Sequence, residues 1–113
     1  MNYLKKITIS VALATSITST ADAYTEGQIE LCEGAATLAE HVMEHRQYGT
    51  TMGEALKIYG SLEDDNRFKE LALLFVEMAY DRTRWHTESR KQRAMEDFRD
   101  YIETDCFERM RDN

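Results

Sequence analysis

The stretch His41 to His45, HVMEH, matches the HxxEH pattern of inverzincin proteases, in which two histidines bind zinc and the glutamate acts in catalysis. On a helix, positions 41 and 45 lie one turn apart, so two imidazoles can face the same side, as zinc requires. A protease also needs a third ligand, which in inverzincins is a glutamate far downstream. We expect that ligand to be missing, because this sequence stops before the distance is reached. We therefore expect no metal site, and a hydrolase built on His41, Glu44 and His45 is the weakest functional hypothesis.

Other catalytic patterns are also missing from the sequence. No serine lies in a GxSxG motif, and no glycine-rich loop is present to hold a phosphate. The sequence therefore predicts no enzyme, no catalytic residue and no cofactor.

The first 23 residues have the organisation of a secretory signal peptide. Lys5 and Lys6 precede an apolar run from Ile7 to Thr20, and Ala21-Asp22-Ala23 has small residues where a signal peptidase acts. The run is shorter than the roughly 20 residues that span a bilayer, so cleavage is favoured over an uncleaved anchor. We expect residues 24–113 to be a single helical domain, periplasmic or secreted, with no membrane insertion after cleavage.

The expected mature chain is acidic. Without Lys5, Lys6 and Asp22 it holds 12 basic and 20 acidic residues, a net charge of −8. This charge disfavours nucleic acid and anionic lipid as partners. It fits a basic protein partner, or it serves only to keep a small exported domain soluble.

Cys32 and Cys106 are the only cysteines. Export would place them where disulfides persist, and a redox-active or metal-binding pair would normally show a CxxC spacing. We therefore expect a structural disulfide, worth up to about 4.5 kcal/mol in the chain-entropy model.

Helix signals begin early in the expected mature chain. Thr25 with Gln28 predicts a capping box for a first helix that runs to about Tyr48, where Gly49 ends it. A second capping box, Thr51 with Glu54, predicts a helix of about two turns that ends at Gly60. The apolar stripes of these two helices are Ile29, Cys32, Ala35, Ala36, Ala39, Val42 and Met43, and then Met52, Ala55, Leu56 and Tyr59.

Two further helices are expected. The third begins after Ser61 or Asp64, with acidic residues near its start. Its segment 71–80 is polar only at Glu77, which predicts a central helix or one that has a face in a homodimer interface. The fourth follows Thr87, with the stripe Ala94, Met95, Phe98, Tyr101, Ile102 and Cys106.

The two cysteines connect these helices into one fold. Cys32 and Cys106 both lie on apolar stripes, and a bridge between them would place the first and last helices antiparallel. The sequence thus predicts an all-α protein, a small antiparallel bundle of about four helices with a disulfide between the first and last.

The segment YDRTRWH, residues 80–86, is the stretch expected to contact a partner. It places two arginines beside the only tryptophan, and arginine, tyrosine and tryptophan are enriched at interface hot spots. Alternatively, the tryptophan plugs the end of the bundle and the arginines pair with acidic neighbours, while an arginine at the end of the first helix offsets the helix dipole. The predicted partner-binding residues are Tyr80, Arg82, Arg84, Trp85, Arg46 and Gln47.

Several short motifs follow one another at a characteristic spacing: Cys32-Glu33, Leu38-Ala39, Val42-Met43, Arg46-Gln47, Gly49, Met52, Ala79-Tyr80, Arg84-Trp85, Thr87-Glu88, Gln92-Arg93-Ala94, Phe98 and Cys106. In these positions the chain resembles small exported proteins of proteobacteria and of the phages that infect them. The resemblance implies a periplasmic location and a disulfide-linked helical fold. That family has no established activity, so the resemblance implies no catalytic residue.

Three functional hypotheses follow. The first is a non-catalytic binding or inhibitory module that acts on a periplasmic or envelope protein. The second is a periplasmic acid-stress holdase, an analogy that rests on size, helical fold and a single disulfide. The third is the zinc-dependent hydrolase.

Overall fold

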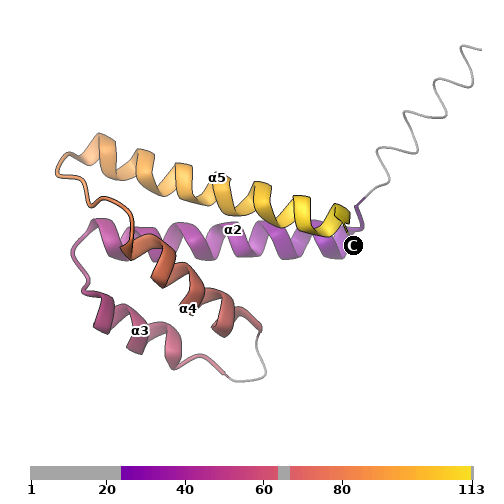
Figure 1. The fold of residues 1–113 in the computed structure, drawn as a ribbon, viewed down its shortest axis with the longest axis horizontal. Coiled ribbons are helices and arrows are strands. Elements are labelled where there is room, and N and C mark those ends of the chain that lie inside the picture. Colours follow the sequence, from indigo (N-terminus) through magenta and orange to yellow (C-terminus); the bar gives the residue numbers. More distant parts are fainter. Residues whose placement is uncertain (1–23, 64–66, 113) are drawn as a thin grey trace, which may run out of the picture.

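The computed structural model describes residues 24–63 and 67–112, which form four helices (Figure 1). These are α2 (Glu26–Gln47), α3 (Met52–Gly60), α4 (Arg67–Tyr80) and α5 (Glu88–Asp112). The predicted all-α fold class is confirmed. The predicted signal peptide, together with Asp64 and Asp65, lies outside the described residues. Within residues 24–63 and 67–112, no helix has the length and apolar character needed to cross a membrane.

Threonine caps begin α2 and α3, as predicted. Thr25 accepts a 3.1 Å hydrogen bond from the amide of Gln28, whose side chain accepts a 3.0 Å bond from the amide of Thr25. This is a complete capping box. Thr51 likewise caps the amide of Glu54 at 3.2 Å, but the Glu54 carboxylate accepts from the Thr51 hydroxyl instead of the Thr51 amide. The second box is therefore only half formed.

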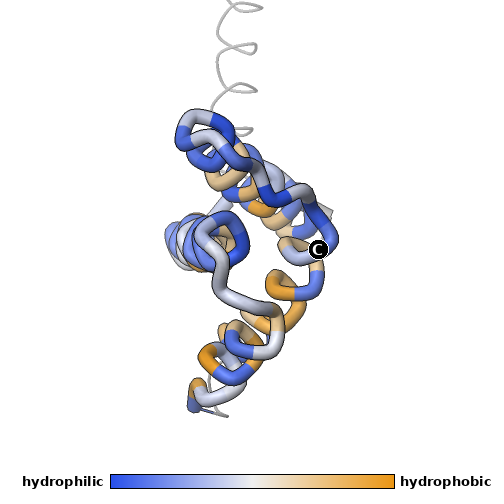
Figure 2. The backbone as a smooth tube through the Cα atoms, turned by 90° about the vertical axis from the view of Figure 1, so that its left-hand side faces the viewer, coloured by the Kyte–Doolittle hydropathy of each residue, from blue (hydrophilic) through white to orange (hydrophobic). Residues whose placement is uncertain are grey.

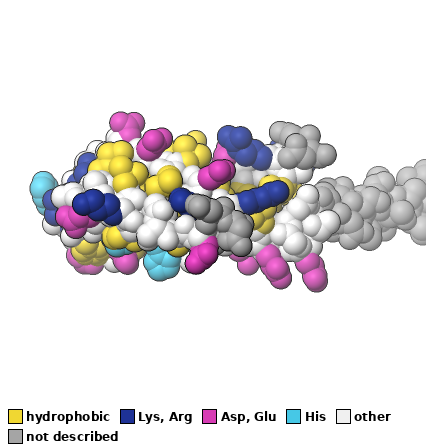
Figure 3. All heavy atoms as spheres, turned by 90° about the horizontal axis from the view of Figure 1, so that it is seen from below, with side chains coloured by type: hydrophobic (Ala, Val, Ile, Leu, Met, Phe, Trp, Pro, Cys, Tyr) yellow, Lys and Arg dark blue, Asp and Glu magenta, His cyan; other side chains and the backbone are white. Residues whose placement is uncertain are grey.

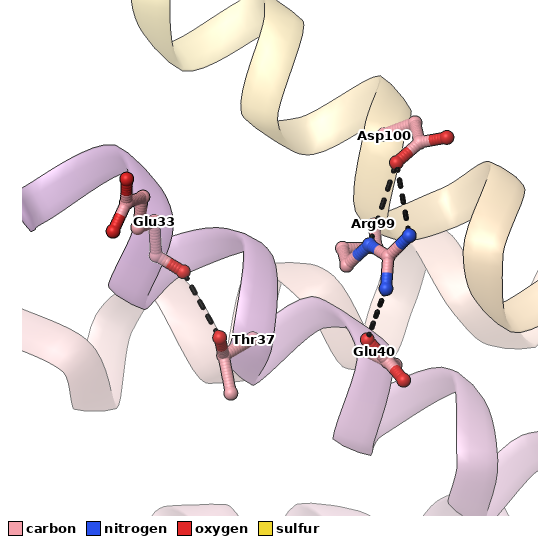
Figure 4. A network of polar contacts seen from close by, with 5 residues as sticks. All are labelled: Glu33, Thr37, Glu40, Arg99 and Asp100. Carbon is pink, nitrogen blue, oxygen red and sulfur yellow. Dashed lines mark hydrogen bonds and ion pairs between the residues drawn. The ribbon is translucent and has the colours of Figure 1, made fainter. Parts of the chain in front are cut away.

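α2 and α5 lie side by side and antiparallel, so the end of α5 is beside the start of α2 (Figure 1). There Cys32 and Cys106 form a disulfide, with Cα atoms 5.5 Å apart. The predicted bridge and the predicted antiparallel placement are both confirmed. Near the middle of the pair, Arg99 of α5 contacts Glu40 of α2 at 3.1 Å and its own neighbour Asp100 at 3.4 Å (Figure 4). Because all three side chains are partly exposed, this ion pair adds little stability.

The core lies where α2, α4 and α5 meet. α4 packs against both α2 and α3. The two short helices, α3 and α4, are more apolar than the two long ones, α2 and α5 (Figure 2). The rings of Phe75 on α4 and Phe98 on α5 meet edge to face, with centroids 6.3 Å apart. Other buried core residues include Ala35, Ala39, Val42, Met43, Ala72, Val76, Ala79, Met95 and Ile102.

Four residues expected on inward stripes are instead exposed: Ile29 by 37%, Met52 by 40%, Leu56 by 37% and Tyr101 by 50%. Ile29 lies near the start of α2, at the end of the molecule that α4 does not reach (Figure 1). Met52 and Leu56 are on α3, which is the outermost helix and packs mainly against α4. A helix with one main neighbour buries only a narrow strip, here Ala55 and Tyr59 on α3.

Candidate functional site at the end of the bundle

The six predicted partner-binding residues lie together at the end of the molecule opposite the disulfide. Two come from the last turn of α2, Tyr80 ends α4, and the other three lie in the loop that follows it. In Figure 1 this loop passes beside the C-terminal end of α2 before it enters α5. We call this region, residues 46–50 and 80–88, the pole.

Gln47 is completely buried, and its side chain is hydrogen-bonded to the loop that follows α4. Its side-chain nitrogen donates to the carbonyl of Thr83 at 2.8 Å, and its side-chain oxygen accepts from the amide of Trp85 at 2.9 Å. Its own carbonyl accepts from Arg84 Nε at 3.4 Å and from the Lys91 ammonium group. Because Gln47 is inaccessible, it can influence a partner only through the loop that it positions.

Arg46 is hydrogen-bonded to the same loop at its start. Its Nε and a terminal nitrogen donate to the carbonyl of Arg82 at 3.2 and 3.0 Å. Its guanidinium also lies 5.2 Å from the ring centre of Tyr80, whose hydroxyl donates to the carbonyl of Thr50 at 2.5 Å. A tyrosine is a donor at neutral pH, and burial raises the pKa of Tyr80 still further above its ordinary value. The last two residues of α2 are thus bonded to the loop at positions 82, 83 and 85.

Trp85 lies at the surface and is 36% exposed. The guanidinium of Arg90 lies 5.1 Å from its ring centre, and Lys91 donates to its carbonyl at 2.5 Å. Arg82 turns the other way, over the rings of Phe98 and Tyr101 at 4.9 and 5.2 Å. These are cation–π contacts, which orient the arginines without neutralising them.

The arginines of the pole have no carboxylate partner in the described part of the chain. The described ion pairs join Arg99 and Arg109 to acidic residues, whereas Arg46, Arg82 and Arg84 donate to carbonyls or lie over rings. Residues 81–93 contain five basic and two acidic residues. This segment of an acidic chain therefore has a local excess of basic residues.

A hydrogen bond joins the end of α2 to the start of α5. The Tyr48 hydroxyl donates to the carboxylate of Glu88, and Gln92 donates to the Tyr48 oxygen at 3.1 Å. The bond from Tyr48 lowers the pKa of Glu88, with a further contribution from Gln92, and the same carboxylate raises the pKa of Tyr48. Lys91 lies 5.4 Å from the centre of the Tyr48 ring.

The HVMEH residues lie on α2 just before the pole. His41 and Glu44 are exposed, whereas His45 is partly buried, with Nδ1 at 3.0 Å from the Thr50 hydroxyl and its ring edge-on to Tyr59. Among residues 24–63 and 67–112, no three histidine, cysteine, aspartate or glutamate side chains are placed to share a metal ion.

A second surface was not predicted as a site. It is an apolar groove of about 310 Å³ between α2, α4 and α5, next to the disulfide. The sequence signal for this groove was the nearly all-apolar segment 71–80. A helix that is apolar on all sides but packs on only one side keeps apolar residues at the surface. The half-exposed residues Leu74 and Tyr101 both line the groove, together with Leu31, Ala35, Leu71, Phe75, Met78, Ile102, Asp105, Cys106, Arg109 and Met110.

Further apolar side chains reach the surface on the side of the molecule that carries α3. Figure 3 shows hydrophobic atoms there, interspersed with acidic and basic groups. Met52, Leu56 and Ile58 of α3 are each more than a third exposed. Because charged residues divide these atoms, they do not form a single large apolar patch of the kind that marks an interface.

Comparisons of the chain with models of known families, with curated proteins and with solved structures find no match.

Proposed function

We propose that this chain is a small exported, non-catalytic binding module that acts on a periplasmic or envelope protein through its pole. The observation that carries the proposal is the placement of exposed Trp85 beside arginines that have no carboxylate partner in the described chain. Tryptophan and arginine supply much of the binding energy at protein interfaces. Because Gln47, Arg46 and Lys91 already fix the loop, little conformational entropy is lost when a partner binds.

The proposed location rests on three observations. The first 23 residues have the pattern of a signal peptide, and the motifs around the cysteines resemble those of small exported proteins. The disulfide between Cys32 and Cys106 fits an oxidising compartment such as the periplasm.

Photocrosslinking in intact cells tests the proposal. A photoreactive amino acid replaces His86, which is exposed in the loop of the pole, and in a matched variant it replaces Thr104, which is exposed on α5 far from the pole. We expect a discrete adduct with an envelope protein from position 86 alone. Adding Trp85→Ala should remove most of that adduct if the tryptophan is the anchor. Equal adducts from both positions, or an adduct that Trp85→Ala leaves unchanged, contradict the proposal.

The acid-stress holdase is the second candidate, and two features favour it. The apolar groove lies between helices, and carboxylates help to join α5 to α2, namely Glu40 with Arg99 and Glu88 with Tyr48. Protonation of Glu88 at low pH weakens its contact with Tyr48, so apolar surface would open to client proteins. A dye for apolar surface and a client-aggregation assay, run from neutral pH to about pH 2–3, separate the candidates, since a pole-binding module should give little client protection.

A further inference from the structure

A second cavity, an open pocket of about 350 Å³, lies at the side of the pole. The end of α2, the turn that follows it, the start of α3 and the end of α4 surround it. Its walls are mainly polar or cationic and consist of Arg46, Gly49, Thr50, Thr51, Met52, Tyr80 and Arg84.

Two guanidinium groups line this pocket. Arg46 uses Nε and one terminal nitrogen to hold the carbonyl of Arg82, and Arg84 uses Nε to contact the carbonyl of Gln47. A guanidinium has five N–H donors, so each arginine retains donors beyond those that position it. Neither arginine contacts a carboxylate within residues 24–63 and 67–112. The two guanidinium groups are thus held in place without an ion pair in the described part of the chain.

Gly49 permits Arg84 to lie against the turn. Its φ is +96°, a conformation that side chains disfavour, and a Cβ there would lie 3.0 Å from a terminal nitrogen of Arg84. A glycine at this position therefore leaves room for the guanidinium at the edge of the pocket. The turn and the loop thus each place one side of Arg84 at the wall that Arg46 also lines.

The geometry points to a carboxylate as the ligand, and we propose that the pocket binds one acidic side chain of a peptide segment in the partner protein. The forked donors of arginine match a planar carboxylate. A doubly charged phosphate or a polyanion is less suitable, because the Glu54 carboxylate accepts a bond from Thr51 of the pocket wall and the expected mature chain is strongly acidic. This proposal rests on the proposed function, since it names the chemistry recognised at the same pole.

A peptide titration tests the pocket without the partner. The oxidised, exported protein is titrated with an end-capped pentapeptide of alternating alanine and glutamate, with the matching glutamine peptide and with inorganic phosphate. Amide NMR signals of Gly49, Thr50 and Arg84 report binding. We expect the glutamate peptide to shift them saturably, the glutamine peptide to have no effect, and phosphate to bind more weakly than the glutamate peptide.

Variants then assign the contact to the two arginines. Arg84→Gln and Arg46→Gln should each weaken binding of the glutamate peptide by roughly tenfold or more. Arg84→Lys keeps the charge without the fork and should retain part of the affinity, and this variant separates recognition from misfolding. Arg111→Gln, an exposed change at the far end of α5, should have no effect.

The pocket proposal fails if both peptides bind alike, if phosphate binds more tightly than the glutamate peptide, or if the pole variants and Arg111→Gln behave alike. These failures are distinct from failure of the proposed function. The proposed function is contradicted by the crosslinking result at positions 86 and 104, whatever the peptide does.

Discussion

The side-chain oxygen of Gln47 lies 2.9 Å from the backbone amide of Trp85, so a completely buried residue of α2 positions an exposed residue of the loop 38 positions later in the chain. The nitrogen of the same side chain holds Thr83. The surface chemistry of the pole therefore depends on a polar group that no partner can reach.

Gln47→Met should loosen the pole without altering its surface residues. Methionine has a similar length but cannot pair with the Trp85 amide or the Thr83 carbonyl. Leaving such groups unpaired should lower the free energy of unfolding by about 1–3 kcal/mol. Urea unfolding measures this change, and amide hydrogen exchange at Trp85 should be faster than in the wild type. Glu96→Met, an exposed change on α5, should have an effect of about 0.5 kcal/mol or less. Equal effects from the two substitutions would show that the buried side chain of Gln47 does not stabilise the loop.

Replacing both Cys32 and Cys106 with serine should lower the free energy of unfolding by about 2–4 kcal/mol. The bridge restricts an unfolded chain across a sequence separation of 74, and the change also places a hydroxyl at the completely buried position 32. Circular dichroism should still show helices, because their caps do not depend on the bridge. The oxidised wild type should contain no free thiol and should migrate faster than its reduced form on a denaturing gel. Free thiols or a bridge between two chains would contradict the intramolecular pairing.

Glu88 should make stability depend on pH. Its pKa in the folded protein is lowered by the hydrogen bond from Tyr48, so its contribution is complete above the unfolded pKa of about 4.3. That contribution disappears as the pH falls through the lower, folded pKa. Unfolding experiments between pH 7 and about pH 3 should show a smaller loss of stability for Glu88→Gln than for the wild type, since glutamine accepts the bond but does not titrate in this range. Glu96→Gln, an exposed change elsewhere on α5, should follow the wild type.

Zinc should not be retained by the HVMEH stretch. His45 is held by Thr50 and Tyr59, and the described residues include no group of three metal-ligating side chains. After dialysis, elemental analysis should give far less than one zinc per chain, in the wild type and in a double variant with alanine at 41 and 45. Stoichiometric zinc that the double variant loses would restore the hydrolase hypothesis.

The sequence predicted the helix order, the first capping box and the antiparallel pair because these depend on local signals and on one possible cysteine pairing. It did not predict which stripe residues are covered, because that depends on how far each neighbour extends. Tyr101 has the spacing of a core residue, but it lies at the rim of a groove where α4 and α5 do not close.

The predicted site residues were found by composition, since arginine beside the only tryptophan is unusual in an acidic chain. Their arrangement was beyond the sequence. Gln47 is polar and was expected to be accessible, yet it is buried because two backbone groups, at positions 83 and 85, satisfy its amide. Such partners are visible only once the fold brings the loop to the end of α2.

The position of the disulfide has a mechanical consequence for the pole. α2 and α5 are joined covalently near one end, whereas hydrogen bonds, a cation–π contact and core packing hold them together towards the other. The disulfide therefore adds nothing directly to the pole, which non-covalent contacts alone hold together. A molecule that contacts both Trp85 and Tyr48 would add a further link between α2 and the loop before α5, at the end that has no covalent one.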